Sequence, residues 1–216
     1  MSWLGGGEPH ECRACPTDIE VLIVPRTVDI GTFQVHRALP FRTRQMVGPF
    51  IFWDQMGPGS FASGMGVDVR PHPHIGLSTV TYLFGGSLDH KDSLGNAVRI
   101  LPGEVNVMCA GHGIVHSERT GQDVRRQPSR LSGIQSWLAL PRAEQECAPG
   151  FTHAGADDIP SFRDAACSGR VILGSFAGYV SPLKMATETL YLELNLKQGA
   201  SIKIPAEVEE RAVYLV

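Results

Sequence analysis

Two short pairs of side chains have the types and spacing that bind a metal ion: His72-Pro73-His74 and His116-Ser117-Glu118. In each pair the two side chains are two residues apart, so on a β-strand both point to the same face. Three imidazoles and one carboxylate can together coordinate a divalent transition metal and leave positions for water or substrate. The sequence therefore predicts a metal site, provided that the two strands are brought together.

Apolar and β-branched runs accompany both pairs. The run 77–84 follows the first pair and ends at Gly85-Gly86, and the run 105–109 lies between a turn at 101–104 and the glycine-rich segment before His116. Runs of this composition bounded by glycine and proline are typical of strands. We expect His72 and His74 at the start of the first of these strands.

The spacing around the first pair is that of a known motif. From Gly66 to His74 the chain follows the first cupin motif, G(x)5HxH(x)3-4E(x)6G, but Ser78 and Thr79 stand where the motif has glutamate. With this departure the sequence resembles the pirin family, a branch of the cupin superfamily. The segments that carry the resemblance are Pro71-His72-Pro73-His74, 89–95, 110–118 and 133–137. In that family two histidines of the first motif and a histidine and a glutamate of the second bind the metal, which implies His72, His74, His116 and Glu118 here.

The resemblance also implies the fold: all-β, a cupin (double-stranded β-helix, or jelly-roll barrel), in a bicupin whose second barrel is incomplete. The expected organisation is a leader at 1–16, an N-terminal metal-binding barrel at 17–140, an interdomain crossing at 141–168 and the start of a C-terminal barrel at 169–216. Pirins continue with several more strands. We therefore expect either a fragment of a longer protein, or a protein partner or self-association that covers the exposed edges.

Further elements are expected from alternation and turn residues. The additional strands are 19–24, 33–39, 50–56, 170–173, 189–196, 201–204 and 211–216, and a short helical turn is expected at 142–147.

A ligand set of three imidazoles and one carboxylate suits Fe(II), with Zn, Mn, Co, Ni or Cu also possible because affinity order alone does not select the metal. Octahedral coordination would leave two open positions, the layout of a ring-cleaving dioxygenase. The resemblance implies a quercetin 2,3-dioxygenase that acts on a small aromatic substrate, a flavonol-like phenol, with Glu118 as the catalytic proton acceptor. It equally implies an alternative: a metal-dependent, redox-sensitive regulatory protein that acts through protein contacts without catalysis.

Other polar side chains lie near the two pairs in sequence. His90 and Asp92 occupy a hairpin that lies near the site in the family, so they either support the ligands or contact substrate, and a solvated turn explains them equally well. His112, among glycines, is a candidate for the pocket rim, whereas His36 is more typical of a structural position. We expect the pocket to be lined from strands that carry Phe50, Phe52, Val80, Tyr82 and Val107, with the inward-facing set left open because it depends on strand register.

Composition limits the other possibilities. The net charge of −3 and the pI of about 6.2 give no basic patch for direct binding of nucleic acid. No apolar run approaches the roughly 20 residues of a membrane span, and residues 1–8 lack the features of a signal peptide, so we expect a cytoplasmic protein with no membrane contact. Cys12 and Cys15 form a C-x-x-C pair that has no second pair for zinc, and we interpret them as ordinary reduced thiols.

Overall fold

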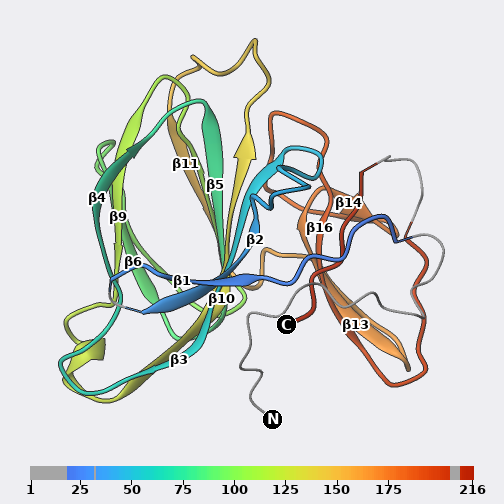
Figure 1. Cartoon of the computed structure of the whole chain (residues 1–216), viewed down its shortest axis with the longest axis horizontal. Coiled ribbons are helices and arrows are strands. Elements are labelled where there is room, and N and C mark those ends of the chain that lie inside the picture. Colours follow the sequence, from blue (N-terminus) through green and yellow to red (C-terminus); the bar gives the residue numbers. More distant parts are fainter. Residues whose placement is uncertain (1–18, 32, 205–209) are drawn as a thin grey trace.

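The computed structural model of the chain describes residues 19–31, 33–204 and 210–216, and β-strands dominate its regular structure (Figure 1). The predicted leader at 1–16, with Cys12 and Cys15, lies outside these residues. Figure 1 shows a larger body that carries β1 to β11 beside a smaller one that carries β12 to β16. The described residues contain no helix long and apolar enough to cross a membrane.

A seven-stranded antiparallel sheet forms the wall between these two bodies. In spatial order its strands are β1 (Arg26–Asp29), β2 (Gln34–Leu39), β3 (Phe50–Phe61), β10 (Ser129–Ala139), β5 (Leu77–Gly85), β8 (Val105–Cys109) and β11 (Gly150–Ala154). The interior strand β5 is buried along almost its whole length, as expected for a strand covered on both faces.

A four-stranded antiparallel sheet packs against one face of this wall and completes the barrel. Its strands, in spatial order, are β4 (Asp68–His74), β9 (Ile114–Arg119), β6 (Leu88–Asp92) and β7 (Ala97–Ile100), and the 3-10 turn Val124–Arg126 follows β9. Contacts across the interior join the two sheets, including a hydrogen bond from Thr81 to Glu118. This two-sheet barrel is the all-β cupin architecture predicted from the sequence.

The barrel interior has apolar side chains at its ends. One cluster gathers residues of both sheets, among them Leu83, Leu88, Ile100 and Leu131, all at most 2% exposed. A smaller cluster of Met108, Ala110 and Ile114 packs with Phe151. These clusters fix the spacing of the two sheets around the polar side chains between them.

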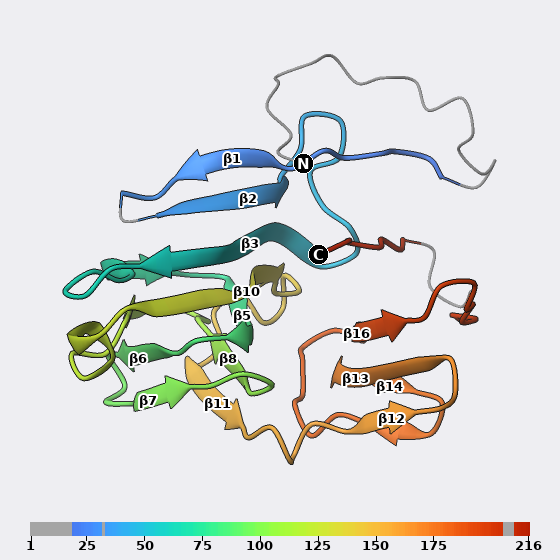
Figure 2. The same cartoon turned by 90° about the horizontal axis from the view of Figure 1, so that it is seen from below.

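The other face of the wall packs against the C-terminal segment (Figure 2). That segment forms a three-stranded sheet of β12 (Ser161–Arg163), β13 (Cys167–Leu173) and β16 (Tyr191–Leu196), and a hairpin of β14 (Ser175–Phe176) and β15 (Tyr179–Val180). Val80, Ile134 and Leu138 of the wall form one core with Ile172 and Leu173. Tyr82 donates a short hydrogen bond to Glu193 across the same interface.

Several expected strands are wrong. Residues 19–24, 201–204 and 211–216 form no strand, and the first described strand begins at Arg26. Alternating apolar residues make a strand only where a neighbour supplies backbone hydrogen bonds. Tyr214 is instead held by its side chain, whose hydroxyl donates to Oε1 of Gln55 at 2.8 Å.

The expected crossing at 141–168 is structured at both ends. Its start forms the expected turn, in which the amide of Glu144 donates to the carbonyl of Pro141 at 2.8 Å. β11 then pairs with β8 and so extends the wall of the barrel to Ala154, whereas β12 belongs to the C-terminal sheet. The division at 140 and the expected partner chain stay predictions.

Candidate metal site

The two predicted pairs lie on neighbouring antiparallel strands. β4 carries His72 and His74, β9 carries His116 and Glu118, and His72 lies directly opposite His116. The histidine pair is therefore at the end of β4, before the turn at Ile75-Gly76, and not at the start of the next strand as expected. Because alternation holds on β4 as well, both imidazoles still face the same side.

The three imidazoles converge. Ring centroids are 4.5 Å apart for His72 and His116, 4.8 Å for His72 and His74, and 5.0 Å for His74 and His116. One nitrogen of each ring lies within 4.8 Å of the other two, a spacing that allows three nitrogens to contact one ion. These residues can therefore hold a metal ion.

Glu118 lies in a second, overlapping group of potential ligands. A carboxylate oxygen of Glu118, a nitrogen of His116 and a nitrogen of His90 lie within 4.8 Å of one another. His116 is common to both groups. The structure thus brings together all four predicted ligands and adds His90, while the assignment of the four ligands to one ion stays a prediction.

The free nitrogens of the site fit a metal ion. Within the described residues, Nε2 of His74 and Nε2 of His116 are buried and have no hydrogen-bond partner. Nδ1 of His72 lies 2.8 Å from the carbonyl oxygen of Arg70, which can only accept, so Nδ1 carries the hydrogen and Nε2 keeps its lone pair. Buried polar atoms without partners are costly, and a cation would satisfy them.

Burial sets the protonation of these groups. Burial, together with the nearby His72, lowers the pKa of His74 to about 4 and that of His116 to about 3. Burial raises the pKa of Glu118, against the opposing effects of His90 and of the Thr81 hydroxyl. At neutral pH both buried imidazoles are neutral, which is the form that binds metals.

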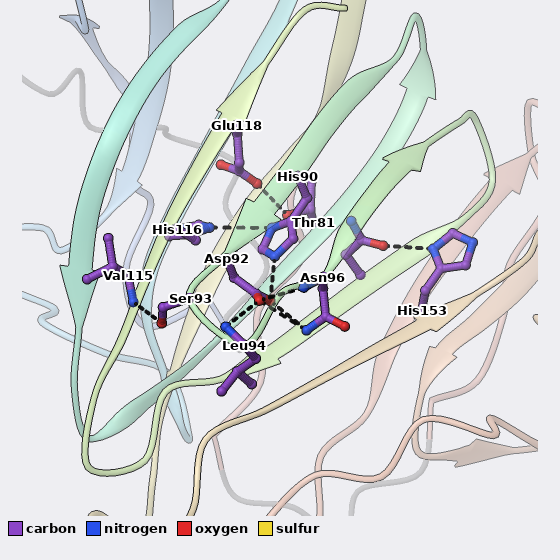
Figure 3. A network of polar contacts seen from close by, with 11 residues as sticks. Thr81, His90, Asp92, Ser93, Leu94, Asn96, Val115, His116, Glu118 and His153 are labelled. Atoms are coloured by element: carbon purple, nitrogen blue, oxygen red, sulfur yellow. Dashed lines mark hydrogen bonds and ion pairs between the residues drawn. The ribbon is translucent and has the colours of Figure 1, made fainter.

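His90 and Asp92 form a buried network beside the ligands (Figure 3). His90 is 3% exposed, so a solvated turn does not describe it. Nε2 of His90 lies 3.0 Å from Oδ2 of Asp92, whose carboxylate also accepts hydrogen bonds from Leu94 and Asn96. Burial alone would raise the pKa of Asp92, but these hydrogen bonds lower it below its usual value. Asp92 is therefore an anionic anchor for His90.

His112 does not join either group of potential ligands. It is exposed in the turn before β9, where its amide donates to the carbonyl of Cys147 at 3.0 Å. The adjacent Gly111 has a φ of +49°, and a Cβ there would collide with the same carbonyl. The turn thus requires glycine, and the role of His112 at a pocket rim stays a prediction.

Sequence reasoning missed the side chains that the wall contributes to the site. Thr81 donates to Oε1 of Glu118 at 3.1 Å and lies 2.8 Å from Oε1 of Gln135. The ring of Trp137 lies 4.9 Å from that of His74, and the ring of Phe151 stacks on that of His90 at 4.4 Å. These residues could have been found only with the strand register, because alternation alone does not say which face is inside.

The expected pocket lining is corrected accordingly. Phe52 faces the barrel and stacks on Trp137, with ring centroids 4.0 Å apart. Phe50, Val80, Tyr82 and Val107 instead belong to the core on the other face of the wall. The single-residue alternation of β3 and β5 divides the expected set between two environments.

Comparisons with known proteins give the same picture over most of the chain. The family model described as Pirin matches residues 32–138. A pirin-like protein of Caulobacter vibrioides is 44% identical over 200 residues, which are 91% of this chain and 69% of that protein. A Pseudomonas aeruginosa protein, provisionally named a quercetin 2,3-dioxygenase, is 36% identical over 89% of this chain and 60% of its own length.

Among solved structures, a crystal structure of quercetin 2,3-dioxygenase from Acinetobacter baumannii matches with a TM-score of 0.75 and 36% identity. The match covers 81% of this chain and 57% of that one. The chain thus spans roughly two thirds or less of the proteins it resembles, and includes the whole of the two-strand histidine site.

Proposed function

Because the chain belongs to the pirin family, we propose that it binds one divalent transition metal, most readily Fe(II), and acts as a dioxygenase of the quercetin 2,3-dioxygenase type. The observation that carries the metal site is the convergence of three imidazoles, two of which have buried nitrogens without a partner in the described residues. The names of the relatives support the activity.

In this proposal His72, His74, His116 and Glu118 hold the ion. Three neutral imidazoles and one carboxylate leave a dication with a net charge near +1, which attracts an anionic oxygen ligand. When bound, the metal supplies this attraction and the redox chemistry of a dioxygenase.

The residues of the chain supply the proton chemistry. The Thr81 hydroxyl donates to Oε1 of Glu118, so Oε2 is the oxygen left for the metal ion and for the proton of a phenolic hydroxyl. In the metal-free protein burial raises the pKa of Glu118, and a bound dication would oppose this effect and keep the carboxylate ionised. Glu118 is thus proposed to deprotonate the substrate.

The aromatic side chains around the histidines favour a flat aromatic substrate. Trp137 packs edge-on against His74, and Phe151 stacks on His90 on another side of the cluster. His72 is less buried than His74 and His116, so the site is reached from the His72 side. A flavonol-like phenol matches these surroundings.

The test is oxygen consumption by a defined metal form. The purified chain is stripped of metal, reconstituted with Fe(II) without oxygen and checked by elemental analysis. Quercetin is then added in an oxygen-electrode cell. We expect about one iron per chain and oxygen uptake that depends on quercetin.

Glu118→Gln is the matched variant, because it keeps the shape and removes the base. It should retain more metal than His116→Ala and lose most of the uptake. Iron bound at one per chain with no uptake for any flavonol would contradict the dioxygenase and favour a regulatory role through protein contacts.

A further inference from the structure

A connected line of polar side chains ends at one of the proposed ligands (Figure 3). It runs from Asp92 to His90, both on β6, and from His90 to the ligand His116 on β9. On β6 and β9, Asp92 lies opposite His116 and His90 lies opposite Glu118. Oδ2 of Asp92 is 3.0 Å from Nε2 of His90, and Nδ1 of His90 is 3.5 Å from Nδ1 of His116, at the long end of hydrogen-bonding distance. The remaining ring nitrogen of His116, Nε2, is buried without a partner among the described residues.

The carboxylate of Asp92 determines which ring nitrogens of His90 and His116 carry a hydrogen. The anionic Asp92 can only accept, so Nε2 of His90 must donate. Neutral His90 then has a lone pair on Nδ1, and the contact with His116 becomes a hydrogen bond only if His116 carries its hydrogen on Nδ1. That tautomer leaves the lone pair of His116 on Nε2, the nitrogen that has no protein partner.

We propose that Asp92 and His90 are positioning residues that hold His116 in the tautomer that binds metal through Nε2. The inference rests on the proposed metal site and adds to it the reason why His116 presents that nitrogen. Ligating histidines commonly donate their other N–H to an acceptor. Here the acceptor is a second histidine, whose own tautomer is set by a carboxylate.

The surroundings keep the line rigid. Phe151 of β11 stacks on the ring of His90 with an angle of 18° between the planes, which fixes the orientation of that ring. Oδ1 of Asp92 accepts from the backbone amides of Leu94 and Asn96 at 2.9 and 3.1 Å, while Oδ2 faces His90 and also accepts from Nδ2 of the Asn96 side chain at 2.9 Å. Because Oδ1 is committed to backbone donors, the carboxylate cannot rotate away.

This arrangement makes Asp92→Asn an informative change. The amide oxygen must take the place of Oδ1 to serve the two backbone donors, so the amide NH₂ faces His90 and the side chain of Asn96, whose own amide must turn its oxygen toward it. His90 Nε2 would then accept, His90 Nδ1 would donate to His116, and His116 would carry its hydrogen on Nε2. The substitution therefore inverts every hydrogen along the line, and the only other rearrangement it requires is the turn of the Asn96 side-chain amide.

The first readout is the tautomer itself, measured in the metal-free protein by long-range proton–nitrogen NMR of the histidine rings. We expect Nδ1–H on His116 in the wild type and Nε2–H in Asp92→Asn. Because no metal is present, this result is independent of whether the chain is a dioxygenase. His116 with Nε2–H in the wild type, or His90 protonated on both nitrogens, would overturn the proposal.

The second readout is affinity for Zn(II), measured by competition with a chromophoric chelator. Asp92→Asn should weaken binding by about 10 to 100-fold, the usual range for a residue that supports a ligand. The matched control is Asp89→Asn, which removes the same charge from the opposite face of β6, where Asp89 pairs with Arg99 at 2.6 Å. We expect unchanged affinity for the control, and equal losses in both variants would contradict the proposal.

A rescue experiment separates positioning from a merely structural role. In His90→Asn, the amide oxygen can stand in for Nδ1 and accept from His116 whatever the state of residue 92. The double variant His90→Asn/Asp92→Asn should therefore bind Zn(II) more tightly than Asp92→Asn alone. If Asp92 and His90 only stabilise the hairpin, the double variant should bind Zn(II) more weakly than Asp92→Asn alone. This result would refute the proposal that they set the tautomer of His116.

Discussion

Neighbouring residues on the strands of the seven-stranded sheet face two different environments: one face contacts the histidine site in the barrel, and the other packs against the C-terminal segment. On β5, Thr81 faces the barrel and binds Glu118, while Tyr82 faces outward and binds Glu193. On β10, Gln135 and Trp137 face the histidines, while Ile134 and Leu138 pack in the C-terminal core. The inner face contributes side chains that contact the proposed ligands of the four-stranded sheet, and the outer face forms the apolar core with the C-terminal segment.

The comparison teaches that metal binding and packing of the C-terminal segment depend on different faces of the same sheet. Substitutions in the histidine site should mainly change affinity for metal, because the site contains buried polar atoms that stabilise nothing by themselves. Substitutions on the outer face should mainly change the free energy of unfolding. Each of the following predictions tests this division.

The largest effect is expected for His116→Ala. Loss of the residue shared by both groups of potential ligands should weaken Zn(II) binding by more than about 100-fold, beyond the range for supporting residues. The wild type should gain about 4 kcal/mol of stability at a Zn(II) concentration of 1,000 times Kd, and the variant should gain almost none. Thermal unfolding with and without Zn(II) measures the difference, and equal stabilisation of both proteins would contradict the site.

On the outer face, Leu173→Ala should destabilise without affecting metal. Leu173 is fully buried in the core between the wall and the C-terminal segment. Its truncation should cost about 2 to 5 kcal/mol, the usual cost of a cavity of this size. Urea unfolding gives this value, while Zn(II) affinity of the folded protein should equal that of the wild type. A parallel loss of affinity would show that the two faces are coupled.

Acid should destabilise the metal-free protein through the two buried histidines of the site. The pKa of His74 is lowered to about 4 and that of His116 to about 3, so between these values and the usual 6.5 the unfolded chain binds more protons than the folded one. Stability of the metal-free protein is therefore full above about pH 6.5 and falls as the pH is lowered, by about 2 kcal/mol per histidine at pH 5. Urea unfolding at several pH values measures this slope.

The smallest effect is expected for Tyr82→Phe, which removes the hydroxyl that donates to Glu193 across the outer interface. Because the Glu193 carboxylate is partly exposed and can be solvated, the loss should be about 1 kcal/mol. Urea unfolding is again the measurement. The Zn(II) affinity of the variant should equal that of the wild type. A loss of affinity would mean that Tyr82, on the outer face of the sheet, influences the metal site on the other side.

The sequence was sufficient for the fold class, the family and the shared face of each ligand pair, because side chains two apart on a strand share a face whatever the register. The same local rule failed for the pocket lining. Val80 and Tyr82 looked no different from Thr79 and Thr81, and only the pairing of β5 with β10 and the packing of the C-terminal segment decide which face is inside.

The end of the chain shows the other limit. Residues 201–204 and 211–216 have strand composition, but a strand also needs a neighbour that lies far away in sequence or in another chain. β11 shows the converse. It lies in a segment expected to be a crossing, and its place is set by its pairing with β8 and by the contact of Phe151 with His90. Neither contact leaves a local pattern in the sequence.

Trp137 and Trp53 lie on opposite sides of the seven-stranded sheet, so their fluorescence can be used to monitor each side separately. Trp137 lies against His74 inside the barrel, whereas Trp53 packs on Tyr191 in the outer core, with centroids 5.1 Å apart. A paramagnetic ion such as Cu(II) held by the histidines should quench the emission of Trp137 first, while separation of the C-terminal segment should shift the emission of Trp53 to the red. Once Trp3 is replaced by phenylalanine, single-tryptophan versions of the chain would let fluorescence follow occupancy of the site and integrity of the outer core as two separate signals.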